Sequence, residues 1–147
     1  MKTIALRFSN NFAPDIGTIA AHNAMIKENG FVWYGKLGSR ISQKTVEVIM
    51  ENENPKILLI HSGAPQRYWA FVDKVQNDIP EVTFIPSYYR DQAGIFKSWF
   101  RVIRFEEAPK NILSQCFVAS SGAPLSNASR HSLSPYFIIN YEESNNQ

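Results

Sequence analysis

The chain has 147 residues, of which 44 % are hydrophobic and 19 % charged, which predicts one folded domain (residues 1–147) and excludes a disordered chain. A net charge of +2 is too small for a protein that binds nucleic acid purely by neutralising phosphates. One cysteine excludes an intrachain disulfide, and no apolar run reaches the ~18 residues of a membrane helix, so we expect a cytoplasmic protein without membrane contacts.

The N-terminal part of the sequence predicts two helices that alternate with strands. Short apolar runs predict the strands, and cap residues predict where the helices begin and end. Thr18 is the expected N-cap of the first helix and Ser42 that of the second. The expected elements are a strand at 3–8, a helix from Thr18 to the stop at Asn29-Gly30, a strand at 31–34 and a helix from Ser42 to about residue 52.

From residue 55 onward the pattern changes to short strands separated by turn residues. The unbroken apolar centre of 56–61 predicts a strand in the middle of the sheet. Further strands are expected at 68–75, 82–85, 99–105, 117–120 and 136–141, with a loop at 121–134 and a frayed tail at 142–147. Strands and helices do not alternate regularly, so the predicted fold class is α+β: a small mixed sheet, curled toward a barrel, with flanking helices.

No arrangement of residues typical of catalysis is found. The histidines are far apart in the sequence, no nucleophile elbow is present, and Cys116 is typical of a small buried residue. The segment 35–39, which carries Lys36 and Ser39 before a helix, predicts at most a weak anion site, because it fits no known nucleotide-binding loop. We therefore predict no metal, no cofactor and no enzyme activity.

The tetrapeptide Ser-Gly-Ala-Pro occurs twice, at 62–65 and 121–124, each time directly after an expected strand. One interpretation is that a common turn composition recurs by chance. The other is that two strand ends place small hydroxyls and backbone amides beside one pocket.

The aromatic residues, 13 % of the chain, are more than a core of this size usually needs, and many occur as adjacent pairs. The pairs are Trp33-Tyr34, Tyr68-Trp69, Tyr88-Tyr89 and Trp99-Phe100. Neighbours in a strand point to opposite faces, so each strand pair should send one ring into the core and leave the other lining a surface or cleft. The outer rings either cover a helix or an oligomer interface, or form a cage that stacks a flat ligand such as a nucleobase.

One aromatic pair lies outside the expected strands, in the proline-started loop 86–91. This loop holds Tyr88 and Tyr89 and lies within a locally basic stretch, residues 84–105. Arg90 in this loop either contacts phosphate, or pairs with Asp91 or stacks on Tyr89.

The order of these features resembles the PUA-like superfamily, in particular EVE and YTH-type domains. The resemblance spans residues 31–141 and rests on the segments FVWYGKLG at 31–38, ILLIHSG at 57–63 and YWAFVDKV at 68–75. Such domains are small barrels with flanking helices. Their EVE and YTH members bind a modified base in an aromatic cage, and some are specificity modules of modification-dependent restriction systems.

The resemblance implies site residues in this sequence. Cage rings are expected from two strands, a closing loop and a further strand, with polar contacts at strand ends and in the loop 120–130. The implied cage residues are Trp33, Tyr34, Trp69 (or Tyr68), Tyr88, Tyr89 and Trp99. The expected polar or phosphate contacts are Lys36, Ser39, Ser62, Gly63, Arg90, Ser120, Ser121 and Arg130.

We therefore expect a module that binds DNA or RNA through a modified, methylated base, with base flipping where the target is a duplex. The resemblance to restriction specificity modules implies an ATPase or nuclease domain or subunit as a partner, which would supply through avidity the affinity that the small net charge does not. Two alternatives remain open. One is a small enzyme acting on a nucleotide or RNA, with Asp91, His61 or His131 as acid or base. The other is a protein-interaction module.

Overall fold

The computed structural model describes residues 1–8, 16–61, 65–132, 134 and 136–142. The predicted tail therefore lies almost entirely outside the described residues. The helices are α1 (Thr18–Asn29), α2 (Gln43–Met50), α3 (Ile112–Gln115) and α4 (Leu125–His131), with 3-10 helices η1 (Val82–Phe84) and η2 (Ser87–Ile95). The strands are β1 (Lys2–Phe8), β2 (Val32–Lys36), β3 (Lys56–His61), β4 (Arg67–Gln76), β5 (Ser98–Glu107), β6 (Cys116–Val118) and β7 (Tyr136–Tyr141).

Within the described residues, the strands form one seven-stranded mixed sheet in the order β2-β5-β4-β3-β1-β7-β6. β1 and β3 run parallel, and the other neighbouring strands run antiparallel. The sheet is curled but not closed: the Lys36 ammonium at the end of β2 lies 4.9 Å from the ring centroid of Tyr136 in β7, far along the strand order. The predicted α+β class with a curled mixed sheet is confirmed, and β3 is its central strand as expected.

The concave face of the curled sheet holds the largest hydrophobic cluster. It joins apolar side chains of β1 to β5 with residues of α1 and α2, which pack against it. Ile41 and Ile49 from the α2 region are fully buried there. The N-cap of α2 is as predicted, because the Ser42 hydroxyl accepts a hydrogen bond from the Thr45 amide at 3.2 Å.

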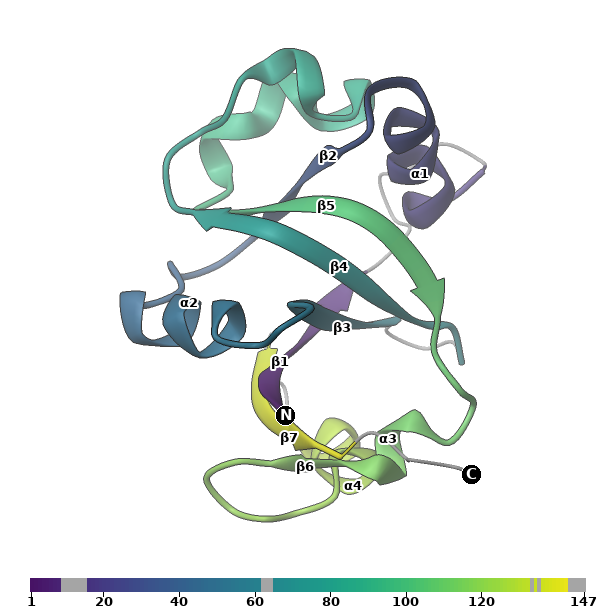
Figure 1. Cartoon of the computed structure of the whole chain (residues 1–147), viewed down its shortest axis with the longest axis vertical. Coiled ribbons are helices and arrows are strands. Elements are labelled where there is room, and N and C mark those ends of the chain that lie inside the picture. The colour runs from purple at the N-terminus through teal and green to yellow at the C-terminus, as the bar shows by residue number, and fades with distance from the viewer. Residues whose placement is uncertain (9–15, 62–64, 133, 135, 143–147) are drawn as a thin grey trace.

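The convex face of the sheet is covered at both ends of the molecule, as Figure 1 shows. At one end α3 and α4 cover β1, β3, β4, β6 and β7, over a cluster that includes Leu58, Trp69 and Ile139. At the other end the teal-to-green segment 82–96 covers β2 and β5, over Trp33 and Trp99. The sheet is therefore the middle of a layered structure, and neither end of its convex face is open.

Three sequence-based expectations about elements are wrong. The expected strand 82–85 is absent: residues 82–84 form η1, because Pro80 and Pro86 bracket the segment and no ladder partner is present among the described residues. The expected loop 121–134 contains α4, which begins directly after Pro124 and buries Leu125. Finally, α1 has Gly17 and not Thr18 at its N-cap, whereas the stop at Gly30 is as expected, with φ at 88°.

None of the helices in the described part of the chain is long and apolar enough to cross a membrane.

Candidate nucleic-acid interface

The aromatic pairs in the strands alternate between the faces of the sheet as predicted. Tyr34 and Phe100 belong to the concave cluster, whereas their neighbours Trp33 and Trp99 belong to the cluster beneath η2. Trp69 likewise points to the convex face, into the cluster beneath α3 and α4. The period of two along each strand thus decides which cluster a ring joins.

The rings on the convex face do not line an open surface, and the expectation that they do is wrong. Trp33 is 6 % exposed and Trp99 is fully buried, because the segment 82–96 packs over both. The sequence did not indicate this covering layer, because the segment 82–96 contains no strand and no long helix. The structure agrees with the other interpretation, in which the outer rings pack against a helix.

We call Tyr89, Phe96 and Trp99 the ring triad, because these three rings contact one another. Phe96 lies 5.0 Å from Tyr89 and 5.4 Å from Trp99, between centroids. Tyr89 and Trp99 are nearly parallel, at 13°, with centroids 6.4 Å apart. The indole Nε1 of Trp99 is buried and has no hydrogen-bond partner among the described residues. A buried donor without a partner costs about 1–3 kcal/mol, so this atom marks a site of unmet hydrogen bonding.

Gly35 in β2 allows the ring triad to approach the sheet. A Cβ atom at this position would lie 2.8 Å from Cγ of Phe96 and 3.0 Å from Cζ3 of Trp99. Both contacts are closer than carbon atoms tolerate, and the first involves the base of the Phe96 ring and not its flexible end. Position 35 therefore has to be glycine for Phe96 to sit where it does.

Replacing Gly35 by alanine should push Phe96 off the sheet and lower the free energy of unfolding by about 1–3 kcal/mol, the usual cost of overpacking a core. Gly94→Ala is the matched control, because a Cβ there meets nothing within 4 Å. The control should change stability by less than about 0.5 kcal/mol. Urea denaturation of both variants measures the difference, and equal effects would show that Phe96 does not pack against β2.

His22 of α1 connects the ring triad to the concave core. Its Nδ1 lies 2.9 Å from the Thr18 carbonyl oxygen, which can only accept, so Nδ1 carries a proton. Nε2 lies 2.8 Å from the Tyr89 hydroxyl and accepts from it in the neutral imidazole. The same hydroxyl lies 3.1 Å from the Trp33 carbonyl oxygen, a second acceptor for its single proton. Tyr89 thereby fastens η2 to both α1 and β2.

The groups around His22 are neutral at pH 7. Burial lowers the pKa of His22 to about 4, and the hydrogen bond to Thr18 offsets part of that effect. Burial raises the pKa of Tyr34 and of Tyr89, and the neighbouring Tyr88 adds to both shifts. Burial also raises the pKa of Tyr88, against a hydrogen bond with the Thr18 side chain. This neutral, aromatic environment suits an uncharged flat ligand and not an ion.

The structure brings five of the six implied cage residues to one region. Trp33, Tyr89 and Trp99 share a cluster that Tyr88 packs against. Tyr34 joins them through His22, at 5.0 Å between ring centroids. Trp69 is the exception: the Lys56 ammonium lies 4.3 Å from its ring centroid, and Tyr141 packs on it at 5.1 Å. It belongs to the α3 and α4 end of the molecule.

Two of the expected phosphate contacts hold the backbone of their own loops. Nζ of Lys36 donates to the carbonyl oxygens of Leu37 and Ser39, at 3.0 and 2.9 Å, and burial lowers the pKa of this amine. Nε and Nη2 of Arg90 donate to the Ile85 carbonyl oxygen at 3.0 and 2.8 Å. Arg90 therefore fixes the start of η2.

The remaining expected polar contacts lie elsewhere. Ser62 and Gly63 fall outside the described residues. Ser120 and Ser121 are exposed in the turn after β6, where the Ser121 hydroxyl accepts from the Ala123 amide at 3.2 Å. That local bond is typical of a turn. Arg130 is exposed on α4, in the wall of a separate pocket at the other end of the molecule.

Two functional candidates were missed by sequence reasoning. His22 gave no signal, because a single histidine in a helix is typical of many structural roles. Phe96 gave none either, because it follows a glycine-containing segment and belongs to no aromatic pair. Within the described residues, no group of three or more His, Cys, Asp or Glu side chains is placed to hold a metal ion.

A curled mixed sheet with helices packed on both of its faces places the chain among small domains that resemble an open β-barrel. A family model described as Pua-like matches residues 4–147, and the chain belongs to this family. Comparisons with curated proteins and with solved structures gave no match. The Pua-like fold is a nucleic-acid-binding fold, and its domains are generally binding modules.

Proposed function

We propose that this domain binds nucleic acid through a modified, methylated base, as EVE and YTH-type domains do, and that the base enters the ring triad. The observation that carries the proposal is the pair of nearly parallel rings, Tyr89 and Trp99, beside an unpartnered indole N–H. Their centroids are 6.4 Å apart, less than the ~7 Å that two stacking contacts of ~3.5 Å require, so the two rings have to move apart slightly to admit a base. In this proposal Trp33, Tyr34 and Tyr88 surround the base-binding site, and Trp69 does not contribute to it.

Phe96 packs on one side of this pair of rings and would close the access of a base to it. Its ring contacts both Tyr89 and Trp99, it is only partly buried, and it directly follows η2. A swing of Phe96 toward solvent would open access to the space between the two parallel rings, which we call the slot. The Trp99 indole N–H would then donate to an acceptor on the edge of the base.

The segment that carries Phe96 has the features of an element that opens at low cost. η2 is a 3-10 helix with a kink at Gln92, where φ is −106° and ψ is 16°. Hydrogen bonds in 3-10 helices have poorer geometry than in α-helices, and Gly94 and Ile95 at the end of η2 are exposed. Tyr89, fastened by His22, would remain in place as one wall of the slot.

The energy balance determines how selective such a site is. Flipping a base costs a few kcal/mol, and stacking on aromatic side chains returns about 1–3 kcal/mol per base. A methyl group buried between rings adds about 0.8 kcal/mol, a preference of about fourfold. Stronger discrimination has to come from the shape of the slot and from the indole hydrogen bond.

The test is a titration of the protein with oligonucleotides that differ in one methyl group, followed by fluorescence anisotropy at low salt. We expect a methylated base to bind at least about fourfold more tightly than the same base without the methyl. Trp99→Phe keeps a ring but removes the N–H, and should weaken binding by about two- to tenfold, the value of one neutral hydrogen bond. Phe96→Ala should bind at least as tightly as the unchanged protein, because no ring has to be displaced.

Phe117→Ala is the control for these variants, because Phe117 is exposed on β6 at the far end of the molecule. It should leave oligonucleotide binding unchanged. The proposal is wrong if no DNA or RNA oligonucleotide binds at low salt, or if Trp99→Phe and Phe117→Ala behave alike.

We also propose that the domain serves a modification-dependent restriction or RNA-processing system, joined to an ATPase or nuclease. The net charge of +2 supports this, because a weakly charged domain gains affinity when a partner holds it near the same strand.

A further inference from the structure

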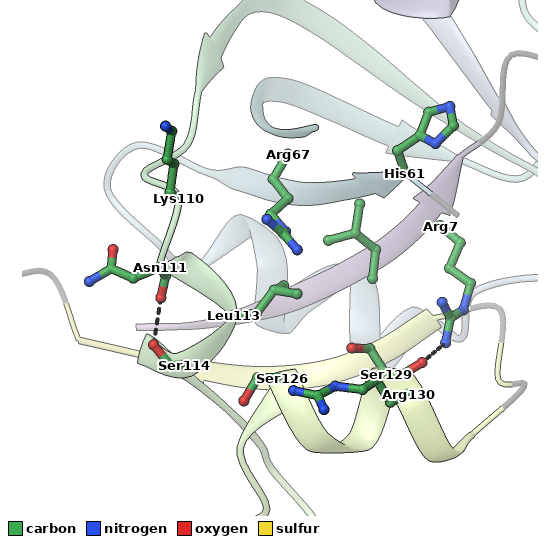
Figure 2. A pocket seen from close by; sticks show the side chains of 11 residues that line it. Arg7, His61, Arg67, Lys110, Asn111, Leu113, Ser114, Ser126, Ser129 and Arg130 are labelled. Atoms are coloured by element: carbon green, nitrogen blue, oxygen red, sulfur yellow. Dashed lines mark hydrogen bonds between the residues drawn. The ribbon is translucent and has the colours of Figure 1, made fainter. Parts of the chain in front are cut away.

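The α3 and α4 end of the molecule contains a pocket of about 430 Å³ that is distant from the ring triad. It lies between α3, α4 and the ends of β1, β3 and β4, as Figure 2 shows. Its floor includes the apolar side chains of Ile60 and Leu113. A pocket of this size accepts a ligand of small-molecule dimensions, larger than a single inorganic ion.

Among the described residues, cations line the pocket and no carboxylate does. Arg7, Arg67, Lys110 and Arg130 contribute positive charge from four separate elements or connections of the chain. None of these four is ion-paired with an acidic side chain of the described residues. Four like charges around one cavity repel one another, so an anion entering the pocket relieves an existing cost.

Among the described residues, Arg7 is the one of the four cations that makes the most hydrogen bonds within the fold. Arg7 donates from Nε and Nη2 to the carbonyl oxygens of Ser134, Ser129 and Ser132, at 3.1, 2.8 and 2.9 Å, and so holds the end of α4. Toward the described residues, Arg67 uses one donor, from Nη1 to the Pro65 carbonyl oxygen at 3.0 Å. A guanidinium has five N–H donors, so most of those on Arg67 remain for a ligand.

Two of the other cations, Arg67 and Arg130, lie on opposite walls of the pocket. In Figure 2, Arg67 reaches down from β4 while Arg130 lies along α4 beneath it, and the Lys110 amine points away from the pocket. Hydroxyl groups of Ser126 and Ser129 lie on the α4 wall between the charges. Two guanidinium groups with nearby hydroxyls match the several acceptor oxygens of a phosphate, which Arg binds in bidentate geometry.

Two arginines of β5 are placed differently, because each lies beside a carboxylate. Arg101 forms an ion pair with Asp73 at 2.7 Å, and Arg104 lies 3.6 Å from Glu106. The basic stretch that the sequence indicated in 84–105 is thus partly neutralised. The pocket draws its charge from positions 7, 67, 110 and 130, which no local pattern connects.

We propose that this pocket is a binding site for the phosphate group of a nucleotide, either free or within a nucleic-acid strand. The phosphate lies between Arg67 and Arg130, and the sugar lies toward Ile60 and Leu113. The site is separate from the ring triad and does not depend on base recognition there.

The experiment measures binding at low salt of three probes: adenosine 5′-monophosphate, a short single strand with a 5′-phosphate, and the same strand without it. Arg130→Gln and Arg67→Gln should each weaken phosphate-dependent binding by about tenfold or more, because each removes a charge-assisted contact. Each should also lower the slope of log affinity against log salt for a strand, by about one unit per lost phosphate contact. If the free nucleotide binds, the phosphate can be that of a mononucleotide. If only a strand binds, the phosphate belongs to a nucleic acid.

Arg104→Gln is the matched control, since it removes an exposed arginine on another part of the surface. The proposal is overturned if no probe binds, or if all three arginine variants bind alike. Because Arg130 is exposed, Arg130→Gln should fold normally even if Arg67→Gln does not. The pocket variants should leave the preference for a methylated base unchanged. The proposal for the pocket and the proposal for the ring triad are therefore tested separately.

Discussion

Lowering the pH from 7 to 4 is expected to remove about 3 kcal/mol of folding free energy through His22 alone. Burial lowers the pKa of His22 from 6.5 in the unfolded chain to about 4 in the fold. Between these values the unfolded state binds the proton and the folded state does not, so stability is full above pH 6.5 and falls as the pH drops toward 4. A difference of about 2.5 units corresponds to about 3 kcal/mol at 1.36 kcal/mol per unit.

Urea denaturation at pH 7, 6, 5 and 4 measures this dependence, with His22→Asn and His131→Gln alongside the unchanged protein. His22→Asn should be less stable at pH 7 and lose less stability on acidification, because the titrating group is gone. His131 is exposed, so His131→Gln should follow the unchanged protein. Parallel curves for all three proteins would show that His22 is not buried in its neutral form.

The second large effect is expected from Trp99→Ala, which should lower the free energy of unfolding by about 3–5 kcal/mol. Trp99 is fully buried between β5 and the segment 82–96, and it contacts Phe96 and Tyr89. Its removal leaves a cavity that the sheet on one side cannot fill. The loss is a large share of the total free energy of unfolding, which is ~5–15 kcal/mol for a domain of this kind.

Phe117→Ala provides the comparison, because it removes an aromatic ring that is 42 % exposed. Phe117→Ala should lower the free energy of unfolding by less than about 1 kcal/mol in the same urea measurement. Trp99→Phe should fall between the two and keeps a folded protein for study if Trp99→Ala unfolds. A cost for Trp99→Ala as small as that of the control would mean that η2 does not pack on β5.

The sequence predicted those strands whose own residues determine them. The apolar runs at 56–61 and 136–141 match β3 and β7 at both ends, because their limits are marked by charged, proline or polar residues. The segment 82–85 misled the prediction because β-branched residues favour a strand only where a neighbouring strand is available. Such availability is a property of the whole fold.

The site was predictable in its residue types but not in its arrangement. Alternation along a strand indicates which face a ring is on, and that part was correct for Trp33, Trp69 and Trp99. It does not indicate where along the face a ring lies, so Trp69 could not be separated from the other two. The basic pocket had still less signal, because its four cations come together only when α3 and α4 fold against the strand ends.

The position of β1 within the sheet has a consequence for the order in which the protein can fold. β1 lies between β3 and β7, with Ala5 opposite Leu58 on one side and Phe137 on the other. A ribosome makes β1 first, but its second partner emerges after more than a hundred further residues. Until then β1 has an unpaired edge, open to pairing with another chain. We therefore expect refolding to be slow for this size and sensitive to protein concentration, as is usual where distant segments must meet.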